Sequence, residues 1–175
     1  MPLITILKTD SEESLKPIVH DGKLSAAGFR FAIVASRWNE FISSQLVEGA
    51  VSAFERLGVG EKSVEIFRVP GAFEVPLLTL KVAQSGKFDA IVCLGTIIRG
   101  QTPHFEYIAS EVARGIAQVG IETGVPAIFG IVTADTVDQA IDRAGVKLGN
   151  KGYEAAMTAV ELVNLYKEAF RKDKG

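Results

Sequence analysis

The chain has 175 residues, of which 47% are hydrophobic, and this size and composition suit one domain with a full core. With 19 Lys and Arg against 21 Asp and Glu the formal net charge is −2, so no basic surplus indicates a nucleic-acid or an anionic membrane partner. One cysteine excludes an intrachain disulfide framework and a thiol-rich metal site, and short apolar runs without a secretory signal predict a cytoplasmic protein.

Residues 1–29 form an arm that we expect to be loosely structured. Pro2–Leu7 has the composition of a short strand, whereas Lys8–Gly28 is polar and is interrupted by proline and glycine. The regular pattern begins after this arm. We therefore expect one domain over residues 30–171 and a short tail over residues 172–175.

Four short apolar runs are typical of buried parallel strands. These runs are Phe31–Ser36, Ser63–Val69, Phe88–Gly95 and Pro126–Thr133. Segments with helical spacing or helix-capping residues follow each of them. These segments are Asn39–Leu57, Glu74–Gln84, Thr102–Glu122, Asp135–Ala144 and a last helix that follows the turn Gly149–Gly152 and reaches Arg171.

Capping residues set the expected ends of these helices. Asn39, Thr102 and Asp135 are predicted N-caps, Pro103 suits a first helical position, and Gly58 suits a helix stop. Alternating strands and helices predict right-handed crossovers in a single-domain, three-layer α/β/α sandwich with a four-stranded parallel sheet. Ligands bind such sheets outside the carboxyl ends of the strands, so candidate site residues are sought there.

Aromatic and acidic residues follow the first two predicted strands. Trp38, the only tryptophan, precedes Asn39 on the first loop. Its indole could stack on a flat heterocycle, or it could simply cover the end of the sheet. Glu74 follows the turn Pro70-Gly71 and could accept hydrogen bonds from ligand hydroxyls, although the helix dipole alone also favours a carboxylate there.

His104 follows the third strand and is the candidate catalytic residue. Gly100 loosens this loop, and Thr102 and Pro103 mark a helix N-terminus whose free N–H groups form an anion site. Histidine suits proton transfer near neutral pH, and the other histidine, His20, lies in the arm. The helix dipole favours the neutral imidazole and a bound phosphate favours the imidazolium. A solvated first-turn histidine is the alternative.

Two cations follow the fourth strand. Arg143 could clamp a phosphate with its planar guanidinium and Lys151 could hold an anion, although both could be ordinary surface charges. Cys93 lies inside an apolar strand and is expected to be a core residue. The sequence has no dinucleotide or Walker A glycine motif and no metal-ligand spacing, which weighs against enzymes of those classes.

Five segments, in order, resemble the motifs of the lumazine synthase family, also called the riboflavin synthase beta-chain family, over about residues 30–170. They are Arg37-Trp38-Asn39, Val69–Pro76, Ile98–Tyr107, Thr133–Thr136, and Arg143-Ala144-Gly145 with Gly149–Ala156. Two positions depart from the family pattern. Trp38 stands where phenylalanine is common, which preserves stacking, and Gln101 stands where a smaller residue is usual.

The resemblance implies a transferase that condenses 5-amino-6-(D-ribitylamino)uracil with 3,4-dihydroxy-2-butanone 4-phosphate, the penultimate step of riboflavin biosynthesis, with no cofactor and no metal. It implies that His104 transfers the proton. The residues implied to bind the ribitylaminouracil are Trp38, Asn39, Ala72, Phe73, Glu74, Ile98, Phe129 and Lys151. Those implied to hold the phosphate are Gln101, Thr102 and Arg143.

The resemblance also implies a flavodoxin-like fold in a homo-oligomer whose sites lie between adjacent subunits, with Phe129 and Lys151 supplied by the neighbour. The family forms pentamers and icosahedral shells of pentamers, and the short turn after Arg143 favours the shell. Pro2–Leu7 is a candidate strand for a neighbour's sheet, and riboflavin synthase is a candidate partner.

Three other functions are compatible with the same scaffold. A flavin-binding or storage protein would keep Trp38 and Glu74 but would not need His104, Thr102 and Arg143 together. An inert structural shell would need no catalytic set at all. A flavodoxin-like electron carrier is expected to be strongly acidic, and this chain is not.

Overall fold

The computed structural model describes residues 16–147 and 149–170 of the chain. The predicted strand Pro2–Leu7 therefore lies outside the described residues. Residues 16–28 contain no helix or strand, but they are attached to the domain. Ala26 is fully buried, and the Asn164 side chain donates a hydrogen bond to the carbonyl of Ser25 (2.8 Å).

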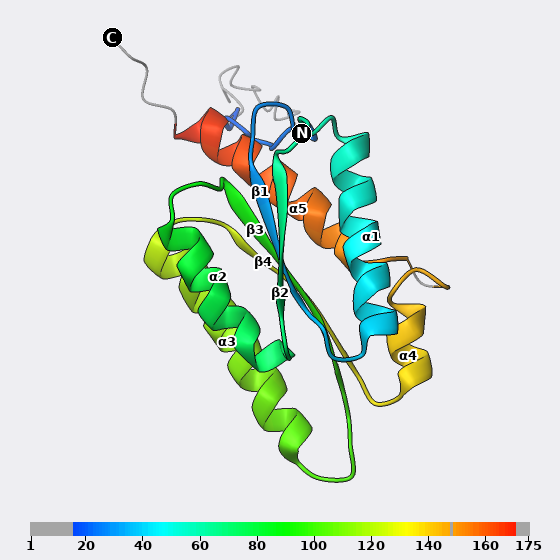
Figure 1. Ribbon diagram of the computed structural model, residues 1–175. Coiled ribbons are helices and arrows are strands. Elements are labelled where there is room, and N and C mark those ends of the chain that lie inside the picture. The colour runs from blue at the N-terminus through cyan, green and yellow to red at the C-terminus, as the bar shows by residue number, and fades with distance from the viewer. Residues whose placement is uncertain (1–15, 148, 171–175) are drawn as a thin grey trace, which may run out of the picture.

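A parallel sheet of four strands forms the centre of the domain, as predicted, in the order β2-β1-β3-β4 (Figure 1). The strands are β1 (Phe31–Ser36), β2 (Val64–Val69), β3 (Ala90–Ile98) and β4 (Ala127–Ala134). The third strand runs three residues beyond its predicted end. Every residue of β1 is buried, because helices cover both faces of the sheet there.

Helices form the two outer layers of the sandwich. Figure 1 shows α1, α4 and α5 on one face of the sheet and α2 and α3 on the other. Two buried apolar clusters, one on each side, join the sheet to these layers. The helices are α1 (Glu40–Arg56), the 3-10 turn η1 (Ala72–Glu74), α2 (Val75–Gln84), α3 (His104–Thr123), α4 (Val137–Asp142) and α5 (Lys151–Ala169).

The predicted N-caps differ from the structure in three helices. Asn39 precedes α1, but its backbone is left-handed (φ 57°, ψ 47°) and its side chain makes no capping bond within the described residues. Helix α3 begins at His104, after Pro103, so Thr102 lies outside the helix and is not its cap. Thr136 rather than Asp135 caps α4, because its hydroxyl accepts from the Gln139 N–H (3.2 Å).

The last helix begins earlier than predicted, within what we expected to be a turn. Asn150 caps α5, since its Oδ1 accepts from the N–H groups of Gly152 (2.9 Å) and Tyr153 (3.1 Å). Its Nδ2 donates to the carbonyls of Gln45 (2.8 Å) and Ala144 (2.9 Å). One amide thus joins α1, the end of α4 and the start of α5, and it places the next residue, Lys151, in a helical first turn.

No helix in the described part of the chain is long and apolar enough to cross a membrane. The same residues contain no group of three or more His, Cys, Asp or Glu side chains that could hold a metal ion.

Candidate functional site

A cavity of about 240 Å³ opens at the carboxyl edge of the sheet, between the loops that follow β1 and β3. Its lining is mainly apolar and aromatic, with a few hydroxyl, amide and imidazole groups. The lining residues are Trp38, Asn39, Ala72, Phe73, Thr96, Ile97, Ile98, Gly100, Thr102, His104, Phe105 and Ile108. This is the edge at which sequence analysis placed the site.

Trp38 lines this cavity, and backbone hydrogen bonds and a contact with Gly71 fix its position. Its N–H donates to the carbonyl of Pro70 (3.0 Å), and its own carbonyl accepts from the Ser43 hydroxyl (3.1 Å). The indole lies against Gly71, where an added Cβ would be 2.9 Å from its Cε3 atom. The side chain is nevertheless 69% exposed. A supported aromatic face that remains open to solvent suits stacking on a planar ligand.

Asn39 directs its side chain into the site instead of capping its helix. Its Nδ2 donates a long hydrogen bond to the carbonyl of Thr96 (3.4 Å) near the end of β3. The left-handed backbone of Asn39 makes this possible, because the residue turns away from α1 while its carbonyl still accepts from Ile42 and Ser43.

The loop after β3 brings the candidate acid–base residue to the same cavity. Because β3 continues to Ile98, Ile97 and Ile98 also line the cavity and form its apolar floor. Thr102 and His104, at the start of α3, belong to the same lining as Trp38. The Glu106 N–H donates to the carbonyl of Pro103 (3.0 Å), whereas the N–H groups before it in that turn lack intrahelical acceptors, which favours an anion there.

Thr96 is a site residue that sequence analysis missed. It is 4% exposed, it lines the cavity, and its hydroxyl has no hydrogen-bond partner among the described residues. A buried hydroxyl without a partner is costly, so a ligand or a water at this position would be stabilised. Only its position, two residues before the end of a buried strand, could have indicated it.

Glu74 and Gln101 are among the expected site residues that do not line this cavity. The Glu74 carboxylate accepts from the Gly71 N–H (2.9 Å), so in this chain it fixes the turn that supports Trp38. Gln101 is exposed on the loop before α3 and does not line either cavity at this edge. The Glu74 carboxylate could contact a ligand only while it also accepts the hydrogen bond from Gly71.

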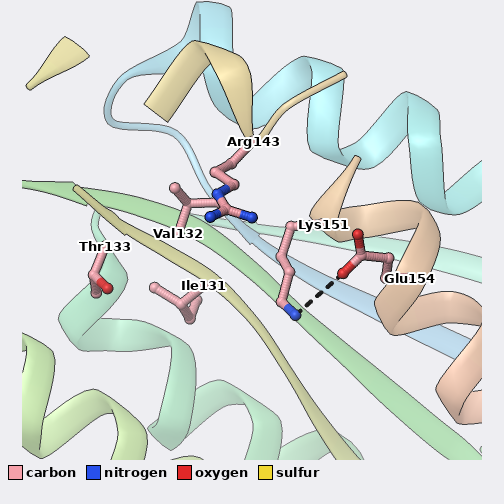
Figure 2. A pocket seen from close by; sticks show the side chains of 6 residues that line it. All are labelled: Ile131, Val132, Thr133, Arg143, Lys151 and Glu154. Carbon is pink, nitrogen blue, oxygen red and sulfur yellow. Dashed lines mark hydrogen bonds and ion pairs between the residues drawn. The ribbon is translucent and has the colours of Figure 1, made fainter. Parts of the chain in front are cut away.

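Arg143 and Lys151 line a different cavity, of about 280 Å³, beside the edge strand β4. Figure 2 shows both side chains directed toward that strand, together with Ile131, Val132 and Thr133. The Lys151 ammonium lies 3.3 Å from the Glu154 carboxylate, and both side chains are about half exposed. An exposed pair of this kind is weak, so the ammonium remains free to bind an anion. Phe129 lies on β4 as well and is 39% exposed, but it lines neither cavity.

The two cavities of one chain have no lining residue in common. The first contains an aromatic plate and a histidine but no lysine or arginine. The second contains two cations but no histidine, and it lies at an edge of the sheet. The family resemblance implies that Arg143 and Thr102 both hold the phosphate, and within one chain they line different cavities.

Cys93 is a core residue, as predicted. Its thiol is fully buried and lies 3.3 Å from the Thr79 hydroxyl. Burial raises the pKa of the Cys93 thiol to about 12, despite the hydrogen bond between Cys93 and Thr79, which lowers it. The thiol therefore stays protonated and unreactive in the folded protein at neutral pH.

Known proteins with similar sequences support a single family. A family model described as 6,7-dimethyl-8-ribityllumazine synthase matches residues 28–167. A protein of Syntrophus aciditrophicus (strain SB), named 6,7-dimethyl-8-ribityllumazine synthase, is 53% identical over 152 residues, which cover 87% of this chain and 99% of that protein. A solved sigma-54 interaction domain protein from Enterococcus faecalis aligns over 85% of this chain and 100% of its own, at 14% identity and a TM-score of 0.30, which does not indicate a shared fold.

Proposed function

This chain belongs to the 6,7-dimethyl-8-ribityllumazine synthase family, and we propose that its active site is assembled from the two cavities of adjacent subunits. The enzyme is a transferase of riboflavin biosynthesis. It condenses 5-amino-6-(D-ribitylamino)uracil with 3,4-dihydroxy-2-butanone 4-phosphate and releases 6,7-dimethyl-8-ribityllumazine, phosphate and water.

The division of chemistry between the two cavities is the observation that carries the proposal. Cationic side chains strengthen the binding of a phosphorylated substrate, and the His104 cavity has no lysine or arginine in its lining. The Arg143 cavity has two cations beside β4, at an open edge of the sheet where a neighbouring subunit can lie. A ring of subunits, each placing its β4 edge against the next subunit's His104 cavity, would complete every site in the same way.

We assign substrate roles to the residues of the composite site on this basis. Trp38 stacks on the pyrimidine, while Asn39, Ala72, Phe73 and Ile98 surround the ring and the ribityl chain. Thr102 and the first turn of α3 bind the phosphate from one side. Arg143 binds it from the neighbouring subunit, with Phe129 and Lys151 beside the pyrimidine. Glu74, Gln101 and Phe129 line neither cavity. Phe129 is assigned because it lies on β4, the strand beside Arg143 and Lys151.

The reaction needs positioning and proton transfer more than covalent catalysis. The uracil amine attacks the ketone and loses water to form an imine with the substrate itself. A proton then leaves carbon as phosphate departs, and His104 is placed to accept it. The departing phosphate is stabilised by the guanidinium of Arg143 and by the free N–H groups of α3. Loss of phosphate leaves an enol, which tautomerises to a methyl ketone. The second amine attacks this new carbonyl, and loss of a second water closes the ring and completes the product.

Purified protein mixed with both substrates tests the activity directly. The expected result is lumazine absorbance that rises together with an equal amount of phosphate. Riboflavin that quenched Trp38 fluorescence without any product from the substrates would favour the flavin-binding alternative. Light scattering on the same sample would measure the mass of the assembly. It would show whether the subunits form a pentamer or an icosahedral shell.

Mixed oligomers test whether the site is shared. His104→Ala and Arg143→Ala are each expected to be strongly impaired. Subunits of the two variants, unfolded and refolded together in equal amounts, are expected to recover about a quarter of wild-type activity, because about one site in four then pairs a native His104 with a native Arg143. Co-refolded His104→Ala and wild-type subunits are the control. Activity no higher than the mean of the two variants would place both residues in a single-chain site and contradict the proposal.

A further inference from the structure

Arg99 connects the two strands that end at the active-site edge. It is the first residue after β3, and its N–H donates to the carbonyl of Ala134, the last residue of β4 (2.9 Å). Its side chain then reaches past the end of β4, where Nε donates to the Asp135 carboxylate (2.6 Å). Backbone and side chain thus join the loop after β3 to the segment after β4.

The same guanidinium holds the first turn of α3. Nη1 of Arg99 donates to the Glu106 carboxylate (3.1 Å), and the guanidinium carbon lies 4.5 Å from the centre of the Phe105 ring. Phe105 and Glu106 directly follow His104 in the chain. Within the described residues no side chain caps the start of α3. Phe105 packs against the core, and Arg99 adds a hydrogen bond that joins this turn to the end of β4.

The contacts of Arg99 are not those of a substrate ligand. It lines neither cavity, and two carboxylates already balance its charge. Its bonds to Asp135 and Glu106 raise the pKa of Arg99 further above the ordinary arginine value, so it stays protonated. Its partners are exposed, and exposed ion pairs contribute little to global stability. A guanidinium with two carboxylates and a ring around it is instead well suited to fixing an orientation.

We propose that Arg99 is a positioning residue that sets the orientation of His104 by joining the first turn of α3 to the end of β4. This inference rests on the proposed role of His104 in proton transfer. Arg99 touches neither the substrates nor the reacting atoms. It acts through the two residues after His104, and a misplaced imidazole loses the alignment that proton transfer requires.

Kinetics of four proteins test the inference: wild type, Arg99→Met, His104→Ala and the double variant. We expect Arg99→Met to lower kcat about 10-fold, with the KM of both substrates within about twofold of wild type. In the His104→Ala background, Arg99→Met is expected to lower kcat by less than about twofold, because the residue that Arg99 positions is gone. Arg99→Lys is expected to be intermediate, since one ammonium cannot reproduce the planar fork. Arg114→Met, which removes an arginine paired with Glu111 on the same helix, is the matched control and is expected to be silent.

Each other outcome overturns the inference. Equal losses in both backgrounds would show that Arg99 acts independently of His104. A raised KM for the phosphorylated substrate at unchanged kcat would make it a phosphate ligand. A melting temperature several degrees below that of Arg114→Met would make its role structural. An active wild type with any of these results defeats the inference alone, whereas a wild type that forms no lumazine defeats the proposed function and the inference with it.

Discussion

His104→Ala is expected to lower kcat about 100-fold and to leave the reaction measurable. The imidazole lines the His104 cavity at the start of α3, where it can accept the proton that leaves carbon as phosphate departs. The residual rate comes from features that the substitution does not touch. These are the aromatic ring of Trp38, the free N–H groups at the start of α3 and the alignment of two substrates in the composite site. Steady-state rates of lumazine formation give the measurement.

His20→Ala is the matched control, because His20 is the only other histidine and lies exposed in the residues before β1. It is expected to have wild-type kinetics. Complete loss of activity in a correctly assembled His104→Ala protein would mean that substrate alignment supplies little of the rate acceleration. Wild-type activity in that protein would mean that His104 does not transfer the proton. Gel filtration of each variant shows whether the assembly is intact.

Gly152→Ala is expected to destabilise the protein by about 3 kcal/mol or more. Gly152 lies in the first turn of α5, where an added Cβ would be 1.9 Å from the carbonyl oxygen of Leu46 in α1. The clash is with backbone, so no side chain can rotate away, and α1 and α5 must separate. These two helices form the main contact within one outer layer, and Ala50, Ala155 and Ala159 are almost fully buried there. Urea unfolding followed by circular dichroism measures the change.

Gly120→Ala is the control for this prediction. Gly120 also lies in a helix, α3, but its Cβ would be 3.7 Å from the nearest atoms, an ordinary contact. This change is expected to stabilise the protein slightly, by about 0.5–1 kcal/mol, because alanine favours the helix. Alkylation of Cys93 offers a second measurement, since the buried thiol reacts only when the core opens. Equal stability of the two variants would contradict the close approach of α1 and α5.

The contact between α1 and the start of α5 also positions the cations of the Arg143 cavity. The start of α5 carries Lys151, and the backbone N–H of Lys151 donates to the carbonyl of Arg143 (2.9 Å). Both cations of the β4 cavity therefore depend on how closely α5 lies against α1. The Asn150 side chain packs against Gly49 of α1. A Cβ added at Gly49 would lie 2.2 Å from Oδ1 of Asn150. Small residues at this contact thus serve the site as well as the core.

Much of the fold could be predicted from the sequence alone. The apolar runs and the helical periodicity between them gave a four-stranded parallel sheet in a three-layer sandwich, and the structure confirms it. The carboxyl-edge rule then placed Trp38 and His104 at one end of the sheet, where both line the same cavity. These features depend on local patterns and on the handedness of crossovers, which hold for any chain of this type.

The side-chain partners were decided only by the tertiary structure. Asp135 was predicted to cap α4, yet it binds Arg99, which lies 36 residues earlier and reaches it because β3 and β4 end together. Asn39 was predicted to cap α1, yet it turns to Thr96. Arg143 lies with Lys151 beside the edge strand of its own chain, so it can share a phosphate with Thr102, as the resemblance implies, only across a subunit boundary. A polar group near a helix start can satisfy its hydrogen bonds locally or across the fold, and sequence spacing does not contain the distances that choose between them.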